Sequence, residues 1–174
     1  MRHSPDITKI LNDIGHFFYT ELPMMAIDSG WTRDSQWTDG ILCRMADLGH
    51  QHGFRVFASQ NRCPTADGPE WLYDQHWRAA NDGDGLARIP LVMEIEWGFG
   101  EATLFEEVKK DSLKLVQARA DLRVMVFQGN YIPTMTDSLI SLADCFEGTQ
   151  QGDRYFFAGW GWDTKKMHCR MWNA

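Results

Sequence analysis

The stretch PLVMEIEW, residues 90–97, decides which fold this sequence predicts. Side chains alternate between the two sides of a β-strand, so Glu94 and Glu96 point to one side and the apolar residues at 91, 93 and 95 to the other. The apolar side has the pattern of a sheet core. The sequence therefore predicts a strand at Ile89–Trp97 that carries two acids on one face.

Two neighbouring carboxylates on one sheet face repel each other and destabilise the strand unless a positive charge lies between them. Asp74 belongs to the preceding predicted strand, Glu70–Trp77, although Asp is a poor strand former. If these two strands pair across the NDGDG turn at residues 81–85, Asp74 comes close to Glu94. Hard divalent cations prefer carboxylate oxygens as ligands. We therefore expect Asp74, Glu94 and Glu96 to hold a divalent metal ion together.

The sequence on either side of this stretch alternates between helical and strand patterns. Helices are predicted at Ile7–Leu22, Ser35–Leu48, Thr103–Arg119 and Asp137–Phe146, and strands at Phe54–Ala58, Glu70–Trp77, Ile89–Trp97, Leu122–Phe127, Tyr155–Trp160 and Met167–Trp172. Asp6 caps the first helix and Pro23 ends it. This order favours an α/β fold, a mixed sheet with helices on its faces. The first three strands can form a meander, and the helix before the fourth strand is a crossover that allows a parallel pair.

The helix at Thr103–Arg119 carries a further candidate for the site. At about 100° per residue, Lys114 falls at the border of the apolar stripe and can lean over the sheet edge. A lysine in that position can orient a water molecule or steady a phosphate. Asp111 is interpreted as a surface charge of the same helix. His76 follows Asp74 by two residues on the same strand face and is a candidate neighbour of the acids.

The composition limits the function. A chain of 174 residues fits one domain and buries roughly 70% of its surface on folding. The net charge of −7 weakens a nucleic-acid function, because proteins that coat nucleic acid nonspecifically are usually basic. An acidic chain can still act on nucleic acid when a metal ion brings positive charge into the site. The four cysteines form no CxxC pair, and this spacing does not favour structural zinc.

The sequence shows no targeting signal. Residues 1–5 are polar and precede no signal-peptide pattern, and no apolar stretch approaches the ~18 residues of a spanning helix. We therefore expect a soluble, cytoplasmic protein with no membrane partner. Its cysteines are expected to be free thiols.

These acids and their surroundings resemble the PD-(D/E)xK nuclease superfamily, which has the restriction-endonuclease-like fold. The core of that fold runs helix–strand–strand–strand–helix–strand, and residues 35–127 run in the same order. The family has an Asp early in the second core strand and a (D/E)xK pair on the third. The resemblance places Asp74 at the first position, Glu94 at the second and Glu96 at the third. It implies a single domain, 1–174, with a nuclease-like core at about 35–127 and additions at both ends.

The third position departs from the family pattern, because Glu96 stands where Lys is usual. Some restriction enzymes of the superfamily carry Glu there. Other members move the lysine into the following helix, where Lys114 would match. The acid that many members carry on the first helix would correspond to Asp39 or Asp47.

The resemblance implies a Mg²⁺-dependent (or Mn²⁺-dependent) nuclease that hydrolyses phosphodiester bonds. Asp74 and Glu94 would hold the metal, and Lys114 or Glu96 would position or deprotonate the attacking water. Nucleic acid of unspecified type is the implied partner, and a homodimer is compatible with the family. One alternative is a catalytically silent, nuclease-like binding or regulatory protein. Another is a small-molecule-binding or interaction domain whose carboxylates belong only to the surface.

The tryptophans near the C-terminus, at positions 160, 162 and 172, have two interpretations. The simpler is core and edge packing of the last two strands. The other is base stacking, because aromatic faces accept any base.

Overall fold

A six-stranded mixed sheet forms the centre of the protein. The structure is a computed structural model that describes residues 6–81, 83–98 and 100–174. The strands are β1 (Arg55–Ala58), β2 (Gln75–Asn81), β3 (Gly83–Glu96), β4 (Leu122–Gly129), β5 (Arg154–Gly161) and β6 (Lys166–Asn173), and they lie in that order across the sheet. β1, β2 and β3 form an antiparallel meander, β3, β4 and β5 are parallel, and β6 returns antiparallel to β5. The predicted mixed sheet, its meander and its parallel pair are confirmed.

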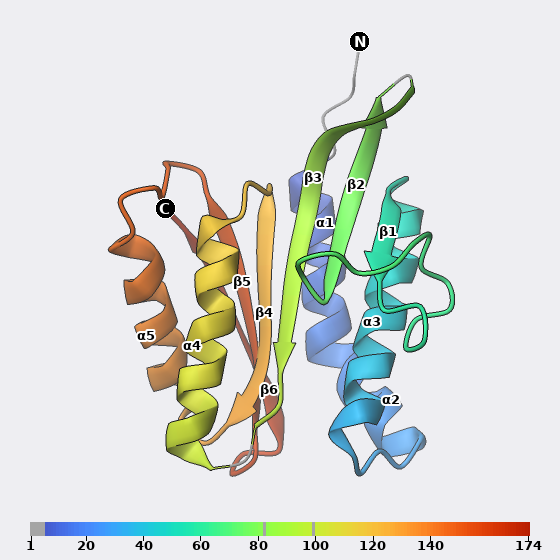
Figure 1. The fold of residues 1–174 in the computed structure, drawn as a ribbon. Coiled ribbons are helices and arrows are strands. Elements are labelled where there is room, and N and C mark those ends of the chain that lie inside the picture. The colour runs from blue at the N-terminus through green and yellow to red at the C-terminus, as the bar shows by residue number, and fades with distance from the viewer. Residues whose placement is uncertain (1–5, 82, 99) are drawn as a thin grey trace.

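Helices cover both faces of the sheet (Figure 1). They are α1 (Ile7–His16), the π-helix η1 (Phe17–Glu21), α2 (Leu22–Asp28), α3 (Asp34–Gln51), α4 (Glu101–Gln117) and α5 (Ile132–Asp144). The α1–α3 region packs on one face and α4 with α5 on the other, so the sheet separates two apolar cores.

The strand β3 lies between these two cores. Leu91, Met93 and Ile95 belong to the core under α1 and α3. Val92 belongs to the core under α4. The predicted alternation is therefore confirmed, and Glu94 lies on the α4 side of the sheet.

Two predictions fall partly outside the described residues. Residues 1–5, where no leader was expected, are not among them. The predicted turn at 81–85 includes Asp82, which is not described either, and β2 ends at Asn81 on one side of it.

No helix in the described part of the chain is long and apolar enough to cross a membrane.

The prediction that Pro23 ends the first helix is wrong. The chain stays helical from Ile7 to Asp28 because a π-helical turn joins α1 to α2. In that turn the Leu22 N–H donates to the carbonyl of Phe17, five residues back. Pro23 then lies in the first turn of α2, where a missing N–H costs little. The N-terminal cap by Asp6 is confirmed, since its side chain accepts from the N–H groups of residues 8 and 9.

Several element boundaries also differ from the prediction. β2 continues to Asn81 and not only to Trp77, and β3 begins at Gly83 and not at Ile89, so both strands extend into the predicted turn at residues 81–85. β2 begins at Gln75 and not at Glu70, because residues 69–74 do not pair with a neighbouring strand. Asp74 therefore lies directly before the strand, in agreement with the low strand propensity of Asp. α5 begins at Ile132 and not at Asp137, with Pro133 in its first turn.

Helix α3 approaches the sheet closely at Gly49. A Cβ atom built on Gly49 would lie 2.5 Å from Val56 Cγ2 and 2.9 Å from Trp77 Cε2. Both neighbours are fully buried, so neither side chain can move aside without disturbing the core. The absence of a side chain at Gly49 therefore sets the distance between α3 and the sheet.

We predict that Gly49→Ala lowers Tm by about 2–10 °C, because the new methyl group overpacks the core. Gly15→Ala is the matched control, since it adds the same methyl group to α1 where no atom lies within 4 Å. That control should raise Tm by about 1–4 °C through helix propensity. Thermal melts monitored by circular dichroism measure both. Equal changes in the two variants would contradict a close approach at Gly49.

Candidate active site

The strands β2 and β3 bring Asp74 and Glu94 together. Gln75 pairs with Met93, so the residue before Gln75 lies next to the residue after Met93. The Ile95 N–H donates to Asp74 Oδ2 over 2.8 Å, and this bond fixes the Asp74 side chain to the β3 backbone. The predicted convergence of the two acids is therefore present, although Asp74 is not a strand residue.

Helix α4 adds a lysine to these acids. Lys114 Nζ lies 3.2 Å from each carboxylate oxygen of Glu94. It also lies 2.8 Å from Asp111 Oδ1. The Glu94 side chain is only 3% exposed and that of Lys114 is 39% exposed, so the pair forms at the boundary between the core and solvent. The prediction that Lys114 leans from its helix toward the acids is confirmed.

Asp111, also on α4, belongs to the same site. It hydrogen-bonds with the Glu96 side chain, and Glu107 is also close enough to repel Glu96. The interpretation of Asp111 as a surface charge is wrong, because its side chain is mostly buried between Glu96 and Lys114. The term acidic cluster is used here for Asp74, Glu94, Glu96, Asp111 and Lys114.

Burial, together with an excess of negative over positive charge, raises the pKa of three carboxyl groups in the acidic cluster, those of Asp74, Glu94 and Glu96. Burial, followed by repulsion from Asp74, raises the pKa of Glu94 to about 8 in spite of Lys114. Burial and the nearby Asp111 raise the pKa of Glu96 to about 7. Burial also raises the pKa of Asp74, against the opposing effect of the Ile95 hydrogen bond.

Lys114 responds in the opposite sense. Burial alone would lower its pKa, but the hydrogen bond to Asp111 and the charge of Glu94 outweigh burial and raise it. Lys114 therefore stays protonated throughout the physiological range. It is the cationic centre of a site in which Glu94 and Glu96 exchange protons near neutral pH.

The donor chemistry of the cluster suits a divalent cation of the Mg²⁺ type. No group of three or more His, Cys, Asp or Glu side chains is arranged to enclose a metal, as far as the described residues go. Mg²⁺ does not need such a cage, because it usually takes one or two carboxylates and completes its shell with water and phosphate oxygens. Asp74 and Glu94 are two carboxylates of this kind, one directly before β2 and the other on β3.

Two predicted candidates lie elsewhere. Asp39 and Asp47 are on α3, which packs against the other face of the sheet from Glu94. Asp39 instead forms an ion pair with Arg62 at 3.6 Å. Neither acid belongs to the acidic cluster.

His76 shares the sheet face of the cluster but is engaged by other residues. The Arg78 guanidinium donates to its Nε2 over 2.9 Å, and its ring stacks on Phe57. Burial, together with the Arg78 charge, lowers the pKa of His76 to about 4. His76 is therefore neutral at physiological pH and supports the arginine.

Two residues of this region were not predicted from the sequence. Asp111 precedes Lys114 by three residues, so the two share a helix face, and this spacing is the signal that could have identified the pair. Tyr73 packs beside the cluster, and burial together with the charge of Glu94 raises the pKa of its hydroxyl. No sequence pattern indicates Tyr73, since it lies in the irregular segment before β2.

Comparisons of this chain with models of known protein families, with curated proteins and with solved structures find no match. The geometry and charge of the acidic cluster are therefore the ground for assigning a function.

We predict that Glu94→Gln stabilises the protein more at pH 8 than near pH 5. A carboxyl whose pKa is higher in the folded state than its ordinary 4.5 costs stability as the pH rises above 4.5, and the cost is complete above about pH 8. Removing that carboxyl removes the cost, so Tm at pH 8 should rise by about 2–6 °C, and by less near pH 5.

Glu106→Gln is the control for this comparison, because Glu106 is an exposed acid on α4 outside the cluster. Its effect on Tm should be similar at both pH values. A loss of stability in Glu94→Gln that grows from pH 5 to pH 8 would show that Glu94 is stabilising as an ionised group, contrary to the expected sign.

Proposed function

We propose that this protein is a Mg²⁺-dependent nuclease that hydrolyses phosphodiester bonds. The observation that carries the proposal is the position of Lys114 Nζ, 3.2 Å from both oxygens of Glu94, next to Asp74, which directly precedes the adjoining strand β2. Two neighbouring carboxylates, one on β3 and one directly before β2, with a lysine beside them are the chemical groups of a PD-(D/E)xK site. Here the lysine comes from the helix that follows the third strand.

The order of elements also supports a restriction-endonuclease-like core. α3 is followed by the meander β1–β2–β3, the crossover helix α4 and the parallel strand β4. This is the helix–strand–strand–strand–helix–strand order of that superfamily. α1, α2, α5, β5 and β6 would be additions to the core.

Each member of the cluster has a role in this proposal. Asp74 and Glu94 would hold Mg²⁺, which supplies positive charge beside the scissile phosphate and makes water easier to deprotonate. Lys114 stays protonated and steadies the negative charge of the phosphate. Glu96 has a pKa of about 7 and would accept the proton of the attacking water, because a general base works best when its pKa is close to the working pH. Asp111 positions both Lys114 and Glu96.

The second candidate is a catalytically silent module with the same fold. It is favoured by the two ion pairs of Lys114, which already place a cation between Glu94 and Asp111. In a silent protein this lysine would replace the metal permanently. The two candidates therefore differ in whether Mg²⁺ binds and whether nucleic acid is cleaved.

We predict that Mg²⁺ or Mn²⁺ raises Tm, because a bound cation relieves the repulsion between Asp74 and Glu94. The shift should be lost in Asp74→Asn and in Glu94→Gln and kept in Glu106→Gln. Differential scanning fluorimetry over a metal titration measures it. Absence of a shift with either ion in the unchanged protein would contradict the nuclease proposal and favour the silent module.

We also predict that the protein cleaves nucleic acid in Mg²⁺ and that Lys114→Met lowers the cleavage rate by about 10²–10³, because a preorganised positive charge is lost. Lys110→Met is the matched control, since Lys110 lies on the same helix with its side chain 70% exposed. That control should cleave at the normal rate. The assay uses plasmid DNA, single-stranded DNA and RNA, and equal losses in the two lysine variants would argue against a catalytic Lys114.

A further inference from the structure

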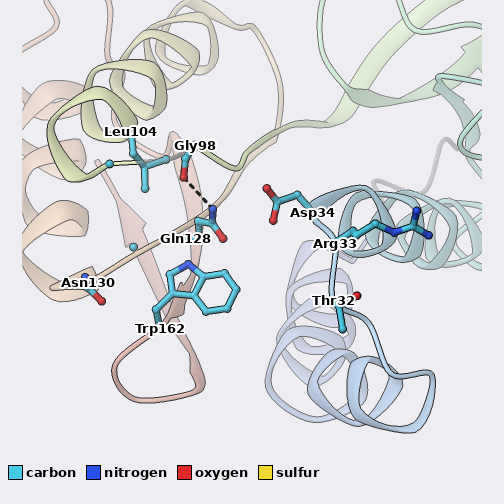
Figure 2. Close-up of a pocket in the computed structure, with 10 residues that line it drawn as sticks. Thr32, Arg33, Asp34, Gly98, Leu104, Gln128, Asn130 and Trp162 are labelled. Carbon is cyan, nitrogen blue, oxygen red and sulfur yellow. Dashed lines mark hydrogen bonds between the residues drawn. The ribbon is translucent and has the colours of Figure 1, made fainter.

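A cavity of about 650 Å³ opens where the parallel strands β3, β4 and β5 end. The segments that line it are distant in sequence. They are the start of α3, the residues after β3, the end of β4 and the turn between β5 and β6. Figure 2 shows the Asp34 carboxylate on one side of the cavity and the Trp162 indole on the other, with Gln128 between them. None of these three residues belongs to the acidic cluster.

The cavity adjoins the acidic cluster through β3. Gly98, which lines the cavity, follows Glu96 by two residues, so their Cα atoms are at most about 7 Å apart. Leu104 lines the cavity as well, from the first turns of the helix that carries Asp111 and Lys114. The backbone therefore places one edge of the cavity close to Glu96.

Trp162 offers a flat surface to a ligand in this cavity. Its side chain is 41% exposed. It packs edge-on against Trp160, with the ring centroids 6.3 Å apart and the planes at 87°, and its backbone N–H donates to the Gly129 carbonyl. Lys165 Nζ lies 5.0 Å from the centre of the ring. Because Lys165 lies over one face of the indole, a nucleobase would stack on the other face, and the cation would attract its phosphate.

Two hydrogen-bond acceptors, on Asp34 and Gln128, line the cavity together with Thr32, Arg33 and Asn130. Gln128 is 4% exposed, and its Nε2 donates to the Gly98 carbonyl over 3.0 Å, so its Oε1 remains to accept a bond. The Asp34 carboxylate points into the cavity and has no ion pair or hydrogen bond with any residue that the structure describes. A ligand that satisfies both groups must present adjacent donors along one edge.

Guanine meets this requirement best among the bases. Its N1–H and N2–H₂ groups are neighbouring donors that can bond both oxygens of one carboxylate, or a carboxylate and an amide oxygen. Adenine and cytosine each place a ring acceptor beside their amino group, and that acceptor would face the Asp34 carboxylate. Thymine and uracil offer one N–H between two carbonyl oxygens. The edge that guanine would use is its Watson–Crick edge, so the base must be unpaired.

We propose that this cavity binds an unpaired guanine of the nucleic-acid substrate, stacked on Trp162 and hydrogen-bonded to Asp34 and Gln128. The inference rests on the proposed nuclease function, because it takes the substrate to be nucleic acid. It narrows that function to single strands, or to bases extruded from a duplex, with a guanine next to the cleaved bond.

The test measures binding without metal, so that it does not depend on cleavage. Fluorescein-labelled oligothymidylates with one central dG, dA, dC or dT are titrated with the full chain in EDTA, and fluorescence anisotropy is recorded. The dG oligomer should bind about tenfold more tightly than the other three. Trp162→Ala should weaken its binding about tenfold, and Trp162→Phe, which keeps a ring, should restore most of the affinity. Asp34→Asn should remove the preference for dG.

Phe146→Ala is the matched control, because Phe146 is an aromatic residue with the same 41% exposure beyond the end of α5. It should leave binding unchanged. Equal affinity for the four oligomers, or tighter binding when the dG is paired in a duplex, would overturn the proposal. So would unchanged binding in Trp162→Ala or Asp34→Asn with the melting temperature preserved.

The nuclease proposal can fail separately. Preferential dG binding without cleavage in Mg²⁺ would refute the nuclease and leave the guanine site. Cleavage that is the same for all four oligomers and in Trp162→Ala would refute the guanine site and leave the nuclease.

Discussion

The contact between Glu94 and Lys114 is the interaction on which the rest of the site depends. It joins the central strand β3 to the crossover helix α4, with Lys114 Nζ equidistant from both carboxylate oxygens. Burying a carboxylate costs several kcal/mol, and the partly exposed Lys114 does not offset that cost. Glu94 therefore binds a proton more readily than an ordinary glutamate. An apolar residue at position 94 would make the folded protein more stable. Buried groups with shifted pKa values are often found at functional sites, and the proposed nuclease function would give this acid a role.

The same balance accounts for the other members of the acidic cluster. Asp74 is tied to the β3 backbone and Asp111 to Lys114 and Glu96, so each acid is held in place by a neighbour. Their mutual repulsion lowers stability at neutral pH, whereas a bound cation would reverse it. Active sites often carry such a cost, because the groups that perform chemistry are held where folding alone would not place them.

The topology explains why two binding features lie next to each other. In open α/β sheets, ligands bind beyond the carboxyl ends of parallel strands, where loops diverge. β3, β4 and β5 are parallel here, and the cavity with Asp34 and Trp162 lies beyond their ends. Glu94 and Glu96 of the acidic cluster lie on the last residues of β3, on the face that α4 covers. A substrate could therefore contact both features through the short connection from Glu96 to Gly98.

Helices and strands with a clear local pattern of apolar and polar residues could be predicted from the sequence. The alternation along residues 90–97 placed Glu94 and Glu96 on one face, and helical periodicity placed Lys114 at the border of the apolar stripe. The order of strands and helices was sufficient to predict a mixed sheet with a parallel crossover. The predictions failed at Pro23, which a π-helical turn accommodates, and at Asp74, whose side chain bonds the N–H of Ile95, 21 residues away, in place of strand pairing.

Contacts between side chains of different elements depend on tertiary packing and could not be predicted from local patterns. Asp111 was taken for a surface charge because its partner Glu96 belongs to another element. Asp39 and Asp47 were candidates until α3 packed on the opposite face of the sheet. The cavity joins residues 34, 98, 128 and 162, and no periodicity connects positions so far apart. Such sites arise from the way that elements pack, which depends on long-range contacts that a local pattern does not contain.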